Sequence, residues 1–169
     1  MASFAVFLRA VNVGGTGKLP MKALVALCEA NGCREVRTYI QSGNVVLVTD
    51  LARARLRSAL QDALAIELGK PVGVVVRTRS ELSNILADNP FPTANPSRVI
   101  VMLADKPLAP CEVVGADGEQ VVFHGRELYI HYPQGQGRSK LKLPAAYSTL
   151  VTGRNLNTLG RVAALFAGS

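Results

Sequence analysis

Glycines and basic residues near the start of the sequence suggest anion binding. The run Gly14-Gly15-Thr16-Gly17-Lys18 has the glycine content of a phosphate-binding loop. However, Asn12 stands where that motif needs glycine, and Leu19 stands where it needs the hydroxyl that ligates magnesium. Backbone N–H groups and Lys18 can still surround an anion there. A glycine loop with no ligand explains the same residues equally well.

A second candidate anion site lies near the end of the chain. The stretch Arg154-Asn155-Leu156-Asn157-Thr158 precedes a predicted helix, whose first N–H groups carry partial positive charge. Asn and Thr at this point also cap helices, which is the simpler interpretation. The anion-site hypothesis becomes stronger if the fold brings further cations to this helix. Those cations are Arg9, Lys18, Arg138 and Lys140.

Catalytic and metal-binding patterns are weak. Ser42-Gly43-Asn44 presents a hydroxyl, but a tight turn between two strands is the better interpretation. His124 and His131 fall on the outer, solvent-facing side of a predicted hairpin, roughly 13 Å apart, which is too far for one ion. Ser139 and Lys140 are neighbours on an extended segment and point to opposite sides. We therefore expect no metal and no cofactor, and the sequence leaves open whether the protein is an enzyme.

Positive charge is concentrated at both ends of the chain. The 169 residues carry 19 Lys and Arg against 12 Asp and Glu, a net charge of +7. Residues 1–80 contribute +6, residues 81–137 contribute −4, and residues 138–169 contribute +5 with no acidic residue. If the two ends meet, they form a face that attracts anions. The absence of Trp argues against a platform that stacks nucleic-acid bases.

Composition indicates a folded cytoplasmic protein of bacterial type. The chain is 49% hydrophobic and 18% charged, which excludes a disordered or low-complexity protein. The longest purely apolar run, at residues 99–104, is too short to cross a bilayer, and the N-terminus lacks the pattern of a signal peptide. Three cysteines without a pairing pattern fit a reducing compartment.

Hydrophobic periodicity predicts an alternation of strands and helices. Helices are predicted over residues 21–31, after Asp50 as the N-cap, after Ser80 as the N-cap, and around residues 159–166. Residues 106–116 are ambiguous between helix and strand, and residues 133–144 form a glycine-rich basic loop. Strands are predicted at residues 4–11, 36–40, 45–49, 72–76, 98–104, 121–124 and 127–132.

This order predicts an α+β fold made of two ferredoxin-like halves of the βαββαβ type, with mixed or antiparallel sheets. The N-terminal half spans residues 1–88. A linker with three prolines follows at residues 89–97, and the C-terminal half spans residues 98–169. Within the second half, the hairpin is expected to turn Val121, Phe123 and the facing apolar residues of its second strand toward the core.

Three stretches in order along the chain resemble the bacterial family known as domain of unknown function 1697. They are residues 8–18, residues 38–45, and residues 137–141 followed by 154–158. The resemblance covers essentially the whole chain and implies a compact α+β protein with ferredoxin-like halves, but no established activity. Leu156 stands where the family usually has Trp, and the stretch from Leu141 to Thr152 is shorter than usual.

The family motifs are mostly polar and basic here, which suits a binding surface. Their residues are Arg9, Asn12, Gly14, Gly15, Lys18, Gln41, Ser42, Gly43, Asn44, Ser139, Lys140, Arg154, Asn155, Asn157 and Thr158. We expect all but Gln41 and Gly43 to contribute to an anion-binding site.

Three functions remain open at this point. The first is binding of a phosphorylated metabolite or a nucleic-acid backbone at a basic surface built from both chain ends. The second is an enzyme acting on a phosphorylated or acidic small molecule. The third is a structural or partner-binding protein, because ferredoxin-like halves can pair through their sheet edges. A fold alone does not choose among them.

Overall fold

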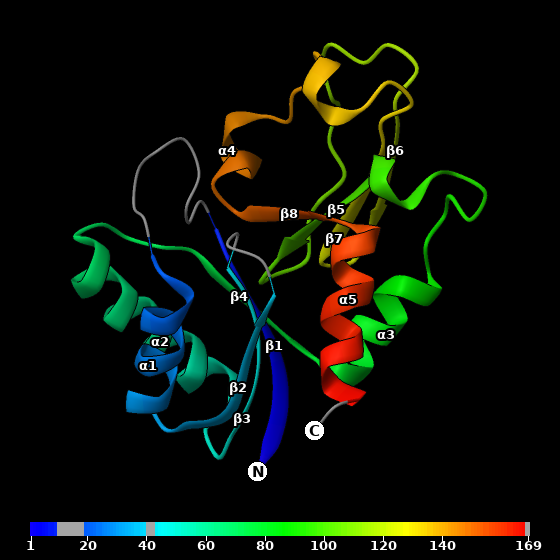
Figure 1. The fold of residues 1–169 in the computed structure, drawn as a ribbon. Coiled ribbons are helices and arrows are strands. Elements are labelled where there is room, and N and C mark those ends of the chain that lie inside the picture. The colour runs from blue at the N-terminus through cyan, green and yellow to red at the C-terminus, as the bar shows by residue number, and fades with distance from the viewer. Residues whose placement is uncertain (10–18, 40–42, 168–169) are drawn as a thin grey trace. The chain divides into compact units, whose positions relative to one another are not determined.

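The computed structural model describes residues 1–9, 19–39 and 43–167 (Figure 1). Within these ranges the protein is an α+β structure with two four-stranded antiparallel sheets and five α-helices. It divides into two compact units. Unit 1 comprises Met1–Ser83 and Arg161–Ser169, and unit 2 comprises Asn84–Gly160. The residues of unit 1 are therefore not all consecutive in the chain.

Unit 1 is built on a sheet with the strand order β2-β3-β1-β4. Every neighbouring pair in it is antiparallel. Helix α1 lies between β1 and β2 in the chain, and helix α2 lies between β3 and β4. The bounds are β1 Ala2–Leu8, α1 Met21–Ala30, β2 Cys33–Tyr39, β3 Asn44–Thr49, α2 Arg53–Leu68 and β4 Val74–Thr78, followed by α3 Arg79–Ala87, which continues into unit 2.

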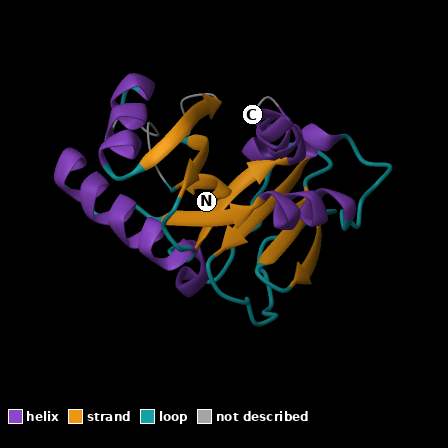
Figure 2. Cartoon of the chain, turned by 90° about the horizontal axis from the view of Figure 1, so that it is seen from below, coloured by secondary structure: helices purple, strands orange, loops and turns teal. Residues whose placement is uncertain are grey.

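Both faces of the central strand β1 are buried. Phe4, Val6 and Leu8 join the core formed with α1 and α2, which lie side by side on that face of the sheet (Figure 2). Ala5 and Phe7 point to the opposite face and are fully buried as well. Burial on both faces explains why this strand reads as a continuous apolar run rather than an alternation. The predicted central strand at this position is confirmed over residues 4–8.

Two helix starts use different residues from those predicted. The hydroxyl of Thr78 accepts a hydrogen bond from the N–H of Glu81, and the Glu81 carboxylate accepts one from the N–H of Thr78. This reciprocal capping box begins α3, so Ser80 is not its N-cap. Asp50 does not cap α2, whose N-cap is Ala52. The Asp50 carboxylate instead lies 3.5 Å from Arg34.

Unit 2 contains a sheet with the order β6-β7-β5-β8. Strands β6 and β7 form a two-residue hairpin in which His124 faces Glu127, as the sequence predicted. The ambiguous residues 106–116 form neither a helix nor a strand. The bounds are β5 Val99–Ala104, β6 Gln120–His124, β7 Glu127–His131, α4 Ala145–Ser148, β8 Val151–Asn155 and α5 Leu156–Ala167, which returns the chain to unit 1.

The hairpin of unit 2 buries side chains on both of its faces. Leu128 and Ile130 join the core of this unit, and Val121 and Phe123 pack against it, which confirms the predicted core face. The other face was predicted to be solvent-facing, and for Tyr129 that prediction is wrong. Tyr129 is buried, and its hydroxyl donates a hydrogen bond of 2.6 Å to the carbonyl of Ile85.

The cysteines differ in burial, so we expect them to differ in reactivity. Cys28 and Cys33 lie in the core of unit 1, and burial raises the pKa of the Cys28 thiol to about 12. Cys111 is half-buried in unit 2. Because the thiolate is the nucleophile, iodoacetamide at pH 8 should alkylate Cys111 in the folded protein and spare Cys28 and Cys33. Mass spectrometry before and after urea unfolding measures this, and native alkylation of Cys28 would contradict the burial.

Candidate functional site

A row of cations lies on the segment that follows β7 in unit 2. Leu141 and Leu143 pack against the core of this unit, so the residues between and before them face outward. Arg138, Lys140 and Lys142 are all exposed, at every second position. Arg138 ends a short 3-10 helix, Gln136–Arg138. Lys140 and Lys142 follow it on an extended segment, where alternate residues lie roughly 6.6 Å apart. We call these three residues the cationic row.

The inner side of this segment is held by hydrogen bonds. The Ser139 hydroxyl donates to the Glu119 carboxylate at 2.8 Å and accepts from the N–H of Leu141 at 3.0 Å. The backbone N–H of Asp117 and the Ser139 hydroxyl both donate to the Glu119 carboxylate, and these two hydrogen bonds lower the pKa of this group. Ser139 therefore serves as an anchor on the inner side, and Lys140 projects from the other side.

The same segment is fixed by a backbone bridge and a close glycine contact. Val114 and Lys142 exchange two backbone hydrogen bonds, of 3.2 and 2.8 Å. The next residue, Gly115, has a φ of +77°, and a Cβ atom there would lie 2.1 Å from the carbonyl oxygen of Lys140. Only glycine allows the two backbones to approach this closely. The cationic row thus has a defined backbone.

No side chain of the cationic row forms an ion pair within the described ranges. The chain from residue 128 to residue 169 contains no acidic residue. Unit 1 carries more charge, with 12 basic against 6 acidic residues in its sequence. Three of its described arginines, however, have structural roles. Arg53 pairs with Glu81, Arg57 donates to the carbonyl of Val74, and Arg77 is fully buried.

The structure gives Arg154 and Asn155 structural partners. Arg154 lies on β8, is 9% exposed, and donates to the Thr152 hydroxyl and the Gly153 carbonyl at 2.8 and 2.9 Å. Burial lowers the pKa of its guanidinium to about 10, so it stays charged at neutral pH. The side-chain oxygen of Asn155 accepts a hydrogen bond from the N–H of Thr158, which confirms the predicted helix cap. Asn157 is exposed.

The N-terminal candidates are divided between structural positions and residues outside the described ranges. Asn44 is fully buried and donates to the carbonyl of Tyr39, the last residue of β2. Gly43 has a φ of +84°, and a Cβ there would lie 2.8 Å from the Cβ of Leu8. Arg9 is half-buried beside Gly73. Asn12, Gly14, Gly15, Lys18, Gln41 and Ser42 lie outside the described residues.

The histidines do not form a metal site with other described residues. His124 lies 3.5 Å from the carboxylate of Asp88, and the ring of His131 lies 5.6 Å from that of Phe91. In residues 1–9, 19–39 and 43–167, no three or more potential ligands gather closely enough to hold an ion.

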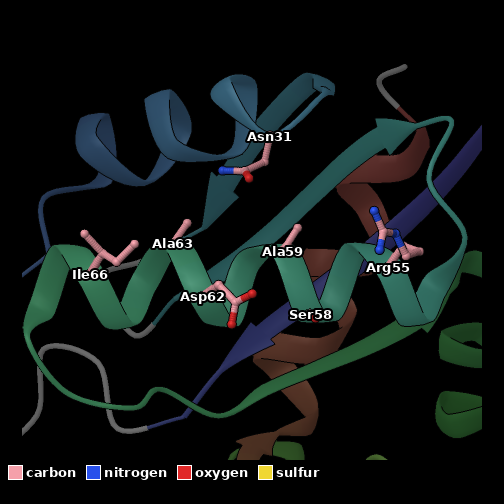
Figure 3. A pocket seen from close by; sticks show the side chains of 7 residues that line it. All are labelled: Asn31, Arg55, Ser58, Ala59, Asp62, Ala63 and Ile66. Carbon is pink, nitrogen blue, oxygen red and sulfur yellow. The ribbon is translucent and has the colours of Figure 1, made fainter.

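A groove of about 390 Å³ in unit 1 runs along α2 (Figure 3). Asn31, at the end of α1, faces α2 across this groove. Its other lining residues, all from α2, combine small, apolar and charged side chains. They are Arg55, Ser58, Ala59, Asp62, Ala63 and Ile66. The groove has no concentration of positive charge, since Asp62 offsets Arg55.

Lys142 and Glu119 were absent from the predicted site. The signal for Lys142 is present in the sequence as the alternation of basic and apolar residues from Lys140 to Leu143, which is typical of an extended segment with one buried face. Glu119 has no local signal, because it is separated from Ser139 by twenty positions and meets it only through folding.

The fold and the cationic row define an α+β protein with two four-stranded antiparallel sheets and an exposed basic segment. The chain belongs to the family described as protein of unknown function DUF1697, whose model matches residues 1–129. This confirms the resemblance seen in the sequence. In the described ranges, no helix has the length and apolar character needed to cross a membrane.

The fold is shared with a solved structure. The conserved bacterial protein SP0830 from Streptococcus pneumoniae is similar, with a TM-score of 0.78 and 20% sequence identity. The similarity covers 96% of this chain and 97% of that protein. At this identity the likeness concerns the fold alone. A comparison with curated proteins found no match.

Proposed function

We propose that this protein binds the phosphate backbone of a nucleic acid through the cationic row in unit 2. The observation that carries the proposal is the row itself, three exposed and unpaired cations at alternate positions of a segment whose other side is anchored. The step from Lys140 to Lys142 is comparable to the step between phosphates along a nucleic-acid strand. Lysine and arginine contacts to phosphate supply most sequence-independent binding to nucleic acids.

The exposure of the row favours a polymer over a small metabolite. Small ligands are usually held in concave sites that bury most of their surface. The row instead lies on an exposed segment, and Arg138, Lys140 and Lys142 each face outward. With no Trp in the chain, binding would depend on charge rather than on base stacking. We therefore expect weak sequence preference and strong dependence on salt.

The experiment is fluorescence anisotropy with a short labelled single-stranded oligonucleotide at several salt concentrations. Replacing Lys140 and Lys142 by alanine should lower affinity and reduce the salt slope by about 1 for each lysine. The matched control replaces Lys22 and Lys106, two exposed lysines elsewhere, and loses the same net charge. Equal loss in both double variants would show that total charge, and not the row, determines binding.

A thermal-shift series with sulfate, nucleotides and sugar phosphates distinguishes nucleic-acid binding from the binding of a small phosphorylated metabolite. A ligand at 100 times its dissociation constant adds about 2.7 kcal/mol to stability. Stabilisation by one small phosphorylated ligand, with little salt dependence, would replace the nucleic acid by a metabolite. No response to any phosphate-bearing ligand would contradict anion binding altogether.

The architecture and cellular location expected from the sequence also remain proposals. The order β2-β3-β1-β4, with α1 and α2 as connections, supports a ferredoxin-like unit 1. The order β6-β7-β5-β8 supports a related unit 2, although the described residues between β5 and β6 contain no helix. Three free cysteines support a reducing compartment such as the bacterial cytoplasm.

A further inference from the structure

Strand β6 is an edge strand that lacks the features which usually prevent an edge from pairing with another chain. It pairs only with β7, and its five residues Gln-Val-Val-Phe-His include no charge, proline or glycine. An edge strand exposes backbone N–H and C=O groups that can pair with another chain, and proteins usually block such edges with charges, prolines or bulges. The absence of these features at β6 indicates that its edge can pair with a strand of another chain.

The other three edges each carry a blocking feature. Strand β2 has a register shift between Arg34 and Arg37, with Glu35 between them at a φ of +50°. On β4, side chains hydrogen-bond the backbone, including Arg57 to the carbonyl of Val74. On β8, the Arg154 side chain donates a hydrogen bond to the carbonyl of Gly153. Strand β6 is therefore the exception among the four.

The pairing of β6 with β7 shows which of its backbone groups face outward. His124 and Glu127 close a two-residue turn and so form a hydrogen-bonded pair. Hydrogen-bonded and non-hydrogen-bonded pairs alternate along an antiparallel ladder, so Val121 and Phe123 direct their N–H and C=O groups away from β7. No described residue hydrogen-bonds these outward groups.

We propose that β6 pairs antiparallel with β6 of a second copy of this chain, with Val122 on the two-fold axis. In this register Val121 forms hydrogen bonds with Phe123 of the other copy, so all outward groups on both strands are satisfied. Gln120 then lies opposite His124. The symmetry is that of an isologous dimer, in which one surface meets itself.

Charge at the ends of the strand favours this orientation. Glu119 precedes β6 and Arg126 follows it in the turn. Antiparallel pairing brings the carboxylate of Glu119 toward the turn that holds Arg126 of the other copy. Parallel pairing would place the two Glu119 carboxylates together, which is unfavourable. The short strand buries less than the ~1,200 Å² of a standard interface, so the dimer should be weak and depend on concentration.

Cysteine cross-linking tests the register directly. In a Cys111→Ser background, Val122→Cys places two cysteines at a non-hydrogen-bonded pair about 4.5 Å apart between Cα atoms, which suits a disulfide. His124→Cys is the matched control, because it lies on the same face and is more exposed. Its two copies would be roughly 13 Å apart. We expect a disulfide-linked dimer from Val122→Cys and essentially none from His124→Cys.

A second variant tests the pairing without a disulfide. Val121→Pro removes an outward N–H and leaves the hydrogen bonds to β7 intact, since edge strands accept proline at such positions. Light scattering over a range of protein concentrations should show a dimer for the native chain and a monomer for Val121→Pro, with similar melting temperatures. A native chain that stays monomeric at the highest concentration, or equal cross-linking of the two cysteine variants, would overturn the proposal.

Discussion

Replacing Arg77 by alanine is expected to lower the free energy of unfolding by about 3–5 kcal/mol, as for the largest core truncations. Arg77 lies on β4 and is the largest fully buried side chain of unit 1. It faces away from the α1 and α2 core, beside Ala5 of the neighbouring strand, and its guanidinium donates to the carbonyl of Val76. Alanine removes both the volume and the donor.

The matched variant is Arg77→Met, which keeps much of the volume and discards the charge. Burying a charge carries a desolvation cost, so a well-packed apolar side chain of similar size is often neutral or stabilising at such a position. We expect Arg77→Met to lose less than half of what Arg77→Ala loses in urea unfolding. Equal losses would show that the hydrogen bonds of the guanidinium, rather than its volume, hold this face together.

Replacing Gly115 by alanine is expected to weaken nucleic-acid binding by about tenfold, or about 1.4 kcal/mol, although it removes no charge. The added Cβ would lie 2.1 Å from the carbonyl oxygen of Lys140, so one of the two backbones must move. That movement breaks the bridge between Val114 and Lys142 and releases the cationic row from its fixed path. The left-handed φ adds a further cost of about 1–3 kcal/mol to stability.

Gly118→Ala is the control for this experiment. Gly118 has a φ of +87° in the same loop, but a Cβ there meets no atom within 4 Å. Gly118→Ala should therefore lower stability only through its strained left-handed backbone conformation. The affinity for the oligonucleotide, measured by anisotropy, should be unchanged. If both variants bind the oligonucleotide like the native chain although Gly115→Ala is the more destabilised of the two, the fixed path of the cationic row is irrelevant to binding.

Local patterns in the sequence predicted most of the elements. The hairpin around Gly125 followed from two alternating apolar runs and a two-residue turn, and its register is as expected. Helix caps were less predictable, since Thr78, Ser80 and Asp50 all suit a cap. The position is settled by partners distant in the chain. Asp50 pairs with Arg34, and Glu81, which completes the box at Thr78, also pairs with Arg53.

The candidate site was harder to predict because a basic residue in a motif can be either buried as part of the structure or exposed for binding. Arg154 and Lys140 are both basic residues in motif stretches, yet Arg154 is buried on β8 and Lys140 is exposed. Their difference depends on which face of each segment is covered, and that is decided by packing. Similarly, the polar Asn44 resembles a binding residue in sequence but is fully buried and donates a hydrogen bond to the carbonyl of Tyr39 at the end of β2.

The assignment of Arg161–Ser169 to unit 1 has a consequence for synthesis on the ribosome. Arg37 of β2 donates to the carbonyl of Leu165, and Arg79 lies over the ring of Phe166. The ribosome makes the four strands of unit 1 first, then the whole of unit 2, and only afterwards these partners. During translation, unit 1 therefore remains incomplete until residues 161–169 have been synthesised. A premature stop near residue 160 would remove these residues from unit 1 and leave the whole of unit 2 intact in sequence.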